Sequence, residues 1–350
     1  MKTIQISSLP LRDVISDIAD GFGTSFEKKC GIFTVSVPDN LGSGIISGID
    51  FDGGLGLIRY ECDFHTDLTF EYSLDRVHPV KFLFCLEGEM SHNFTNETEW
   101  HTISQHKNAV VASSSNHGHR VRFQAGNRTI YSSLELERKS FQGKLNCAPK
   151  ISRSWLDMLN DVNAKKKFYH DGFYSLRISE ILQEWDSVED TDFLKSLLLE
   201  SLAYKILVLQ ITQFQDDLKS EGKKTLLRKS ELNRMLKAMD VIEKNLTDLP
   251  TIQEIASEIG LSPTKLQQGF KELYGKTVNK FILGKRMEVA KTLLLNTDDS
   301  ISSISHAVGI NSVSYFSKIF NKAYGMVPSE FHRQRERPKI DMEALVKEKS

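Results

Sequence analysis

Two segments in the C-terminal half of the chain carry side chains suited to contact DNA bases and phosphates. Glutamine can form paired hydrogen bonds with adenine, serine and threonine can donate or accept, valine can meet a thymine methyl, and lysine can reach phosphate or guanine. The residues expected to face outward are Thr264, Lys265, Gln267, Gln268 and Lys271 in the first segment, and Val313, Ser314, Tyr315, Ser317, Lys318 and Lys322 in the second. A solvated helix surface explains any one of them, and explains Lys271 and Lys322 equally well, but it explains the matched sets poorly.

An internal repeat brings these two segments into register. The first copy runs from Ile252 to Gly275 and the second from Ile301 to Gly325, with an offset of 49 residues before the central turn and 50 after it. In each copy, apolar residues at i, i+3 and i+7 predict a helix with one buried face, and a second helix follows a tight turn. The repeat therefore predicts two helix-turn-helix units, at about residues 252–274 and 301–324. The second helix of such a unit normally enters a major groove.

The same repeat predicts where its helices turn and begin. Gly260 and Gly309 supply the left-handed turn that other residues adopt at a cost, and Ser262 and Asn311 can cap the second helices. The continuous helical stretch Val278–Leu295 joins the two units. At about 1.5 Å per residue it spans about 27 Å, against about 34 Å for one turn of DNA. Two units held by this strut can face successive turns of one groove.

From about Leu236 to Arg337 the chain resembles the AraC/XylS family of bacterial transcription regulators. The resemblance rests on the tandem units, on the bridging stretch KRMEVAKTLLLNTDDSIS and on the terminal stretch GINSVSYFSKIFNKAYGMVPSEF, which is close to the family signature. It implies sequence-specific binding to double-stranded DNA and contact with RNA polymerase. It also places six side chains at the family's base-facing positions: Thr264, Gln267, Gln268, Val313, Ser314 and Lys318.

Residues up to about 141 have the composition of β structure. Short β-branched or aromatic runs alternate with clusters of Gly, Asn, Asp and Ser, as in a sandwich or barrel. The runs are Ile32–Val37, Leu55–Tyr60, Val80–Leu86, Val121–Phe123 and Thr129–Glu135. This part resembles the cupin-like β-barrel that many AraC-type regulators place before the DNA-binding domain, and two stretches, GSGIISGIDFDGGLGLIRYECDF and FLFCLEGEM, are similar to those of siderophore-sensing regulators. The resemblance implies a small effector. The aromatic, Phe-bearing strand pair, with no complete set of metal ligands, predicts a mostly apolar pocket for a small organic molecule or a metal chelate, and the residues of this pocket stay unassigned.

After Ser152 the pattern becomes helical, and Phe193–Lys219 is its most regular segment. The apolar residues Leu199, Leu202, Ile206 and Leu209 step by 3, 4 and 3, as a packed seam requires. Two explanations stay open, and both can hold: the helix is buried against its own barrel, or it forms the seam of a homodimer. The polar segment Asp217–Lys229 is the expected linker.

A cupin-type metalloenzyme is an alternative to a sensor. Such enzymes hold a metal with a His-x-His pair, a downstream acid and a later His, and His117-Gly118-His119 supplies such a pair. The residues that follow, 121–123, include no acid, so burial or a solvated loop explains these histidines better. The four cysteines, Cys30, Cys62, Cys85 and Cys147, include no C-x-x-C pair. We therefore expect no catalysis, no metal site and no cofactor.

Composition and charge favour a folded protein of more than one domain. With 350 residues, 40% hydrophobic and 26% charged, the chain is too long for one ordinary domain and is neither collagen-like nor mainly disordered. The net charge of −1 divides into −8 over residues 1–221 and +7 over residues 222–350, and a basic rear part suits a polyanion partner. The sequence predicts no membrane span and no secretory peptide, and its cysteine usage favours a reducing cytoplasm.

We therefore predict an α+β multidomain protein. Residues 1–150 are expected to form a cupin-like β-barrel effector domain, 151–228 a helical connector and dimerisation region, 229–337 an all-α double helix-turn-helix domain, and 338–350 a charged tail. The predicted function is transcription regulation by sequence-specific DNA binding under the control of a small effector. A cupin-type metalloenzyme and an effector-independent DNA-binding protein are the alternatives.

Overall fold

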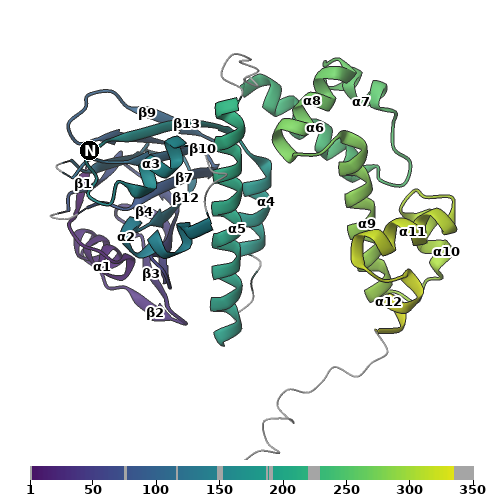
Figure 1. Ribbon diagram of the computed structural model, residues 1–350, viewed down its shortest axis with the longest axis horizontal. Helices are drawn as coiled ribbons and strands as arrows, with labels where there is room; N and C mark the ends of the chain where they lie inside the picture. The colour runs from purple at the N-terminus through teal and green to yellow at the C-terminus, as the bar shows by residue number, and fades with distance from the viewer. Residues whose placement is uncertain are drawn as a thin grey trace, which may run out of the picture. The chain divides into compact units, whose positions relative to one another are not determined.

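The chain divides into two compact units, residues 1–226 and 227–350. The computed structural model describes residues 2–74, 77–115, 117–147, 153–186, 188, 192–219 and 229–334. Every described strand lies in the first unit, and the described part of the second unit consists of helices and their connecting loops (Figure 1). The predicted linker Asp217–Lys229 overlaps the end of one long helix, whereas residues 220–228 and the charged tail 338–350 lie outside the described residues.

Two β-sheets form the core of the first unit. One has the strand order β1-β6-β11-β8-β9 and the other β13-β10-β7-β12-β5-β4-β3-β2. The strands are β1 (Lys2–Ile6), β2 (Glu27–Lys29), β3 (Ile32–Ser36), β4 (Gly42–Phe51), β5 (Leu55–Phe64), β6 (Leu68–Tyr72), β7 (Val80–Glu87), β8 (Glu89–Phe94), β9 (His101–Ser104), β10 (Lys107–Ala112), β11 (His119–Phe123), β12 (Thr129–Leu136) and β13 (Phe168–Tyr174). All five runs predicted as β structure lie in strands, except for Val37, which directly follows β3. The two described sheets are not closed into one barrel, so the cupin-like barrel stays a prediction.

The larger sheet sends alternate side chains into two different cores. Along β7, Leu83 and Cys85 lie in the core that the smaller sheet shares, whereas Phe82 and Phe84 lie in a second core against helices. This period of two is expected of a strand buried on both faces. Helix α1 (Leu11–Phe22) packs into the first core, and it was not predicted within the β-rich region.

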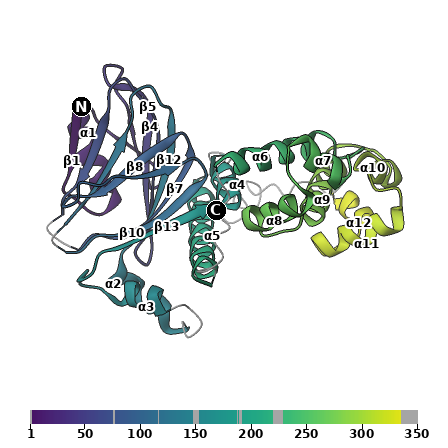
Figure 2. The same ribbon diagram turned by 90° about the horizontal axis from the view of Figure 1, so that it is seen from above.

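Helices α3 (Arg153–Asn160), α4 (Leu176–Asp186) and α5 (Asp192–Lys219) pack in the second core, and α4 and α5 lie side by side (Figures 1 and 2). Leu199, Leu202 and Ile206 of α5 are buried there. The predicted seam thus packs within its own unit. The region after Ser152 is not helical throughout, however, because β13 pairs antiparallel with β10. A strand takes its hydrogen bonds from a partner far away in sequence, so local helical periodicity did not reveal it.

The second unit contains the predicted tandem helices. They are α6 (Lys229–Lys244), α7 (Ile252–Glu258), α8 (Pro263–Tyr274), α9 (Val278–Asn296), α10 (Ile301–Ala307), α11 (Val313–Tyr324) and α12 (Pro328–Gln334). Helices α7 and α8 form the first predicted helix-turn-helix, α10 and α11 form the second, and α9 joins them. None of the helices in the described ranges is both long and apolar enough to cross a membrane.

Candidate nucleic-acid interface

The two turns and helix starts follow the sequence prediction with one exception. Gly260 and Gly309 adopt φ values of 67° and 72°, in the left-handed region as predicted. The Ser262 side chain accepts a hydrogen bond from the backbone N–H of Lys265 at 3.2 Å, which confirms the first cap. In the second helix-turn-helix, the prediction that Asn311 caps the recognition helix was wrong. Ser312 caps α11 instead, because the extra residue in this turn brings Ser312, rather than Asn311, into the position of Ser262.

Each recognition helix, α8 and α11, is oriented by a buried aromatic and aliphatic face. Leu266 and Phe270 of α8, and Phe316 and Phe320 of α11, have no exposed surface. Burying these side chains stabilises each helix against its neighbours and leaves the opposite face open. The chain thereby presents two polar helix faces, one from the second helix of each helix-turn-helix.

Gly269 lies inside α8, where glycine lowers helix stability by about 1 kcal/mol relative to alanine. A Cβ atom at this position would lie 2.6 Å from the sulfur of Met235, a buried residue of α6. The glycine therefore permits close packing of α6 on α8.

The predicted contact residues of α8 differ in their surroundings. Thr264, Lys265, Gln268 and Lys271 are exposed, whereas Gln267 is half-buried. The side-chain oxygen of Gln267 accepts a hydrogen bond from the backbone N–H of Val278, at the start of α9, at 3.1 Å. Gln267 is therefore already engaged within the protein.

Two other polar side chains of α8 have partners at the surface. The Nζ atom of Lys265 lies 2.7 Å from the Glu231 carboxylate of α6. The amide of Gln268 donates to Glu272 at 3.0 Å. Both are exposed contacts, so water and DNA can compete for them at small free-energy cost.

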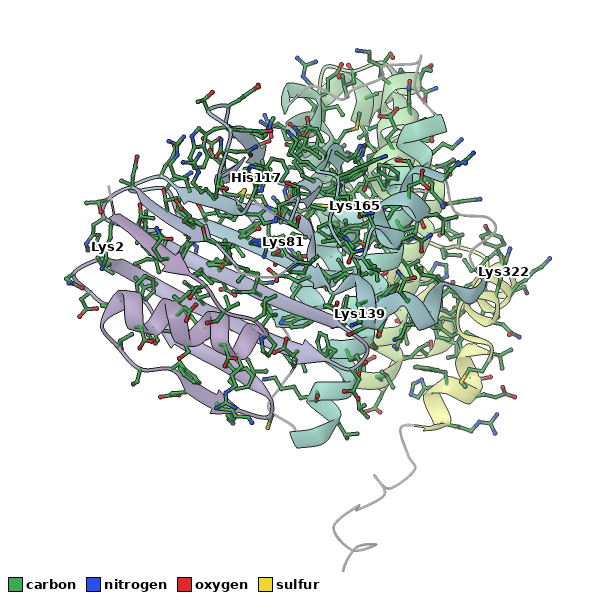
Figure 3. The ribbon with its side chains drawn as sticks, turned by 60° about the vertical axis from the view of Figure 1, so that its left-hand side comes forward. Lys2, Lys81, His117, Lys139, Lys165 and Lys322 are labelled. Atoms are coloured by element: carbon green, nitrogen blue, oxygen red, sulfur yellow. The ribbon has the colours of Figure 1, made fainter. Side chains whose placement is uncertain are left out.

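The predicted contact residues of α11 are less engaged within the protein. Ser314, Tyr315, Lys318 and Lys322 are exposed, and Val313 and Ser317 are half-buried; Tyr315 is 52% exposed. Neither Lys318 nor Lys322 forms an ion pair with any residue that the structure describes, and Figure 3 labels Lys322 at the surface of this unit. The α11 face therefore presents unneutralised positive charge together with hydroxyl groups.

A loop after α6 holds the turn of the second helix-turn-helix. The hydroxyl of Thr247 donates to the carbonyl of Ala307 at 2.6 Å, and Nε of Arg286 on α9 donates to the carbonyl of Leu246 at 3.0 Å. Gly309 lies against this loop, because a Cβ there would be 2.5 Å from the Thr247 carbonyl oxygen. Nothing in the sequence local to Thr247 or Arg286 marks them as positioning residues, so their role was not predicted.

Helix α9 sets the separation of the two helix-turn-helix motifs. It has 19 residues, one more than predicted, so it spans about 28 Å. The buried residues of α9 lie at both of its ends. Phe281 packs beside Phe270 of the first helix-turn-helix, and Leu294 lies in the core of the second helix-turn-helix. Because α9 contributes to both hydrophobic cores, the two recognition helices are connected by a stiff element rather than by a flexible loop.

Comparison with known proteins matches both units. A family model described as "Helix-turn-helix domain" matches residues 255–334, and one described as "Regulatory protein PchR N-terminal domain" matches residues 42–226, more than half of the chain. The chain belongs to the AraC/XylS family of transcription regulators, in the group that carries the PchR-type N-terminal domain.

Individual relatives are more distant. The regulatory protein PocR of Salmonella typhimurium is 26% identical over 51% of this chain and 59% of its own length. The transcriptional activator RhrA of Rhizobium meliloti is 34% identical over 30% of this chain and 34% of its own. A crystal structure of an AraC-type regulator from Chromobacterium violaceum, 28% identical, covers 32% of this chain and all of its own, with a TM-score of 0.30. The chain thus spans 59% or less of these curated relatives.

Proposed function

We propose that this protein regulates transcription by binding a specific double-stranded DNA sequence with α8 and α11. The observation that carries the proposal is the pair of capped recognition helices, each buried on one face and polar on the other, joined by α9. Two such anchors in one chain raise the affinity for a site that presents two successive major-groove segments, because the second contact forms within the complex.

Each recognition helix contributes both base contacts and phosphate contacts in this proposal. Thr264, Gln268, Val313 and Ser314 face the bases, whereas Lys265, Lys271 and Lys322 face phosphates, and Lys318 contacts either guanine or phosphate. Tyr315 and Ser317 lie at the edge of the α11 contact. Gln267 takes part only if DNA displaces its hydrogen bond to Val278, which makes it the weakest member of the set.

Selection of bound duplexes from a random library, followed by hydroxyl-radical footprinting, tests this proposal. We expect one conserved site with two protected segments about one helical turn apart, as the length of α9 requires. The variant Gln268→Ala should relax base preference in one segment, and Gln253→Ala, on the exposed surface of α7, is the matched control. Binding without sequence preference by the unmodified chain would contradict the proposal.

A homodimer through α5 is part of the proposed function. Leu194 and Val208 of α5 are 67% and 60% exposed, and Leu197 and Leu198 are also exposed. Leu197 and Leu198 follow Leu194 by three and four residues, and Val208 lies ten residues after Leu198. At 100° per residue, Leu194, Leu197 and Val208 lie on the face opposite the buried Leu199 and Ile206, where a second helix can pack. The occupant is a second copy of α5, and dimers would double the number of recognition helices on one DNA site.

The first unit is proposed as a cupin-like sensor that responds to a small effector. Its two sheets and the match of residues 42–226 to a regulatory domain support this assignment. A metalloenzyme has less support, because no group of three or more His, Cys, Asp or Glu side chains in the described ranges is placed to hold a metal ion. His119 is buried between strands, and His117 pairs through Nδ1 with the Ser114 hydroxyl at 2.8 Å. The proposal places the protein in the bacterial cytoplasm, where it contacts RNA polymerase as its family does.

A further inference from the structure

Buried basic side chains gather at one end of the two-sheet core of the first unit. His78, His119 and Arg138 are each 2% exposed or less. Val80 at the start of β7 pairs with Leu136 at the end of β12, so the segments that carry His78 and Arg138 leave neighbouring strands at the same end. The ring centroids of His78 and His119 are 5.3 Å apart. The three side chains therefore gather at one end of the core. His119 lies on β11, His78 lies just before β7, and Arg138 begins the short helix α2 (Arg138–Phe141) that follows β12.

Arg138 has unpaired hydrogen-bond donors on one edge of its guanidinium. Its Nη1 donates to the carbonyl of Asp161 at 3.2 Å, while Nε and Nη2 meet no acceptor in the described ranges. Nε–H and Nη2–H point in parallel, and this edge is the one that binds a carboxylate through two parallel hydrogen bonds. A buried cation with unmet donors is unfavourable unless an acceptor binds there.

His78 adds a third donor to this edge of the core. Its Nε2 accepts the backbone N–H of Leu74 at 3.4 Å, so the proton of the neutral ring lies on Nδ1, which has no described partner. Burial, helped by the positive charges of Lys81 and Arg138, lowers the pKa of His78 to about 3. The ring is therefore neutral at pH 7, with a donor and no charge at Nδ1.

His119 supplies a further polar atom beside His78. Its Nδ1 lies 3.0 Å from Nε2 of His92, and its Nε2 has no described partner. Burial is the main reason that the pKa of His119 lies well below the usual value, and the charges of Lys81 and Arg138 lower it further.

The acidic groups near the cluster that the structure describes already have partners. Glu135 pairs with Lys81, both nearly fully buried, and Figure 3 labels Lys81 among the strands of this unit. The Asp161 carboxylate accepts the backbone N–H groups of Lys165 and Lys166, each at 2.9 Å. Within the described ranges, the unpaired donors of Arg138 and His78 therefore have no carboxylate partner, and they are available to a bound anion. The buried ring of Phe94 lies beside the cluster, with its centroid 5.5 Å from that of His119.

We propose that Arg138 and His78 bind the carboxylate of a small organic acid whose remaining part packs against the aromatic side chains of the core. The carboxylate accepts two parallel hydrogen bonds from Nε–H and Nη2–H of Arg138 and one from Nδ1–H of His78. This inference rests on the proposed role of the first unit as a sensor, and it gives the effector a charge class. It also makes one end of the effector site polar, in contrast to the mostly apolar pocket expected from sequence.

Thermal unfolding and calorimetry of the full chain test the assignment with matched small probes. Benzoate should raise the melting temperature, and benzamide, its uncharged counterpart of the same shape, should not. Arg138→Met removes the charged fork and keeps an apolar side chain, so it should weaken benzoate binding about tenfold or more. Arg128→Met, at an exposed arginine of the same unit, is the control and should leave binding unchanged.

The ligand-free stability of the variant separates a binding role from a structural one. If Arg138 serves a ligand, Arg138→Met should unfold at the same temperature as the unmodified chain or a higher one, because a buried charge has been removed. If that variant does not fold, Arg138→Lys keeps the charge, lacks the fork and should show the same loss of benzoate binding.

Several outcomes would overturn the assignment: no response of the unmodified chain to benzoate, hexanoate or cyclohexanecarboxylate, an equal response to benzamide, or a response to inorganic phosphate that exceeds those to the carboxylates. DNA binding by Arg138→Met without ligand is measured in parallel. DNA binding without any carboxylate response rejects only the effector site, whereas a carboxylate response without DNA binding rejects only the proposed regulator.

Discussion

The side-chain oxygen of Gln267 and the backbone N–H of Val278 are joined by a hydrogen bond of 3.1 Å that ties the first recognition helix to the start of α9. The positions that correspond to Gln267 and Val278 in the second copy of the repeat are Ser317 and Pro328. Proline has no backbone N–H to donate, so the second helix-turn-helix cannot form this bond. The two recognition helices are therefore similar in fold but differ in which polar side chains are free.

Replacing Gln267 should affect stability, whereas replacing Gln268 should affect base preference. Gln267→Ala leaves one of the first N–H groups of α9 without its partner, and we expect a loss of about 1 kcal/mol, as for a helix cap. Faster hydrogen exchange at the Val278 amide is the direct measurement. Gln268→Ala should leave that amide unchanged and lower discrimination at one base pair by about 1–3 kcal/mol. Equal stability losses in the two variants would contradict this division.

Lys318→Ala should distinguish a phosphate contact from a base contact. If the side chain pairs with phosphate, binding to all sequences should weaken alike and the salt slope should fall by about one. If it binds guanine, the loss should be confined to one base pair. Titrations at several salt concentrations decide between these results, with Lys28→Ala in the first unit as a charge-matched control. An unchanged slope and unchanged specificity would remove Lys318 from the interface.

Gly309 and Gly325 offer a matched pair for the turn geometry. Both have φ above +70°, so alanine at either position should cost about 1 kcal/mol for the left-handed backbone. Only at Gly309 would the added Cβ also collide with a carbonyl, that of Thr247, whereas nothing lies within 4 Å at Gly325. We expect a total loss of about 3 kcal/mol for Gly309→Ala. Urea unfolding followed by circular dichroism measures both, and similar losses would rule out the close approach.

The dimer proposal predicts opposite results for the two faces of α5. Leu194→Glu with Val208→Glu should give folded monomers, because both side chains are exposed in the single chain. Leu202→Glu should instead unfold the first unit, because it buries a charge in the second core. Light scattering and circular dichroism measure the two effects, with Val289→Glu on α9 as a control for an exposed apolar residue. A monomeric unmodified chain at micromolar concentration would show that the exposed face has no second copy on it.

Stability of the first unit should fall as the pH is lowered below about 6.5. Burial lowers the pKa of His78 and of His92 to about 3, below the usual value of 6.5 that each recovers on unfolding. Between these pH values the unfolded chain binds more protons than the folded chain. Each histidine should therefore lower the free energy of unfolding of the first unit by about 2 kcal/mol between pH 6.5 and pH 5. Urea unfolding at the two pH values measures the loss. His78→Gln should reduce it, and His65→Gln, at an exposed position, should not.

The tandem units could be predicted from the sequence because their signals are local and occur twice. Apolar spacing, the glycine turns and the Ser262 cap depend on residues within one or two helical turns, and comparison of the copies separates shared structural positions from variable ones. The outward-facing set followed from the same periodicity. The exception at Asn311 came from the one-residue insertion in the turn, which moved the cap to Ser312.

Tertiary packing decided the features whose partners are distant in sequence. The face of α5 containing Leu199 and the face containing Leu194 both carry large apolar residues, and only the neighbouring sheet determines which face is buried. Strand β13 likewise exists because β10 accepts it as a partner. The Arg138 cluster could not be read from sequence, since His78, His119 and Arg138 meet only through strand pairing and the stacking of two sheets. Local periodicity determines the elements of this protein, whereas long-range hydrogen bonds and burial determine which of their faces remain available to a ligand.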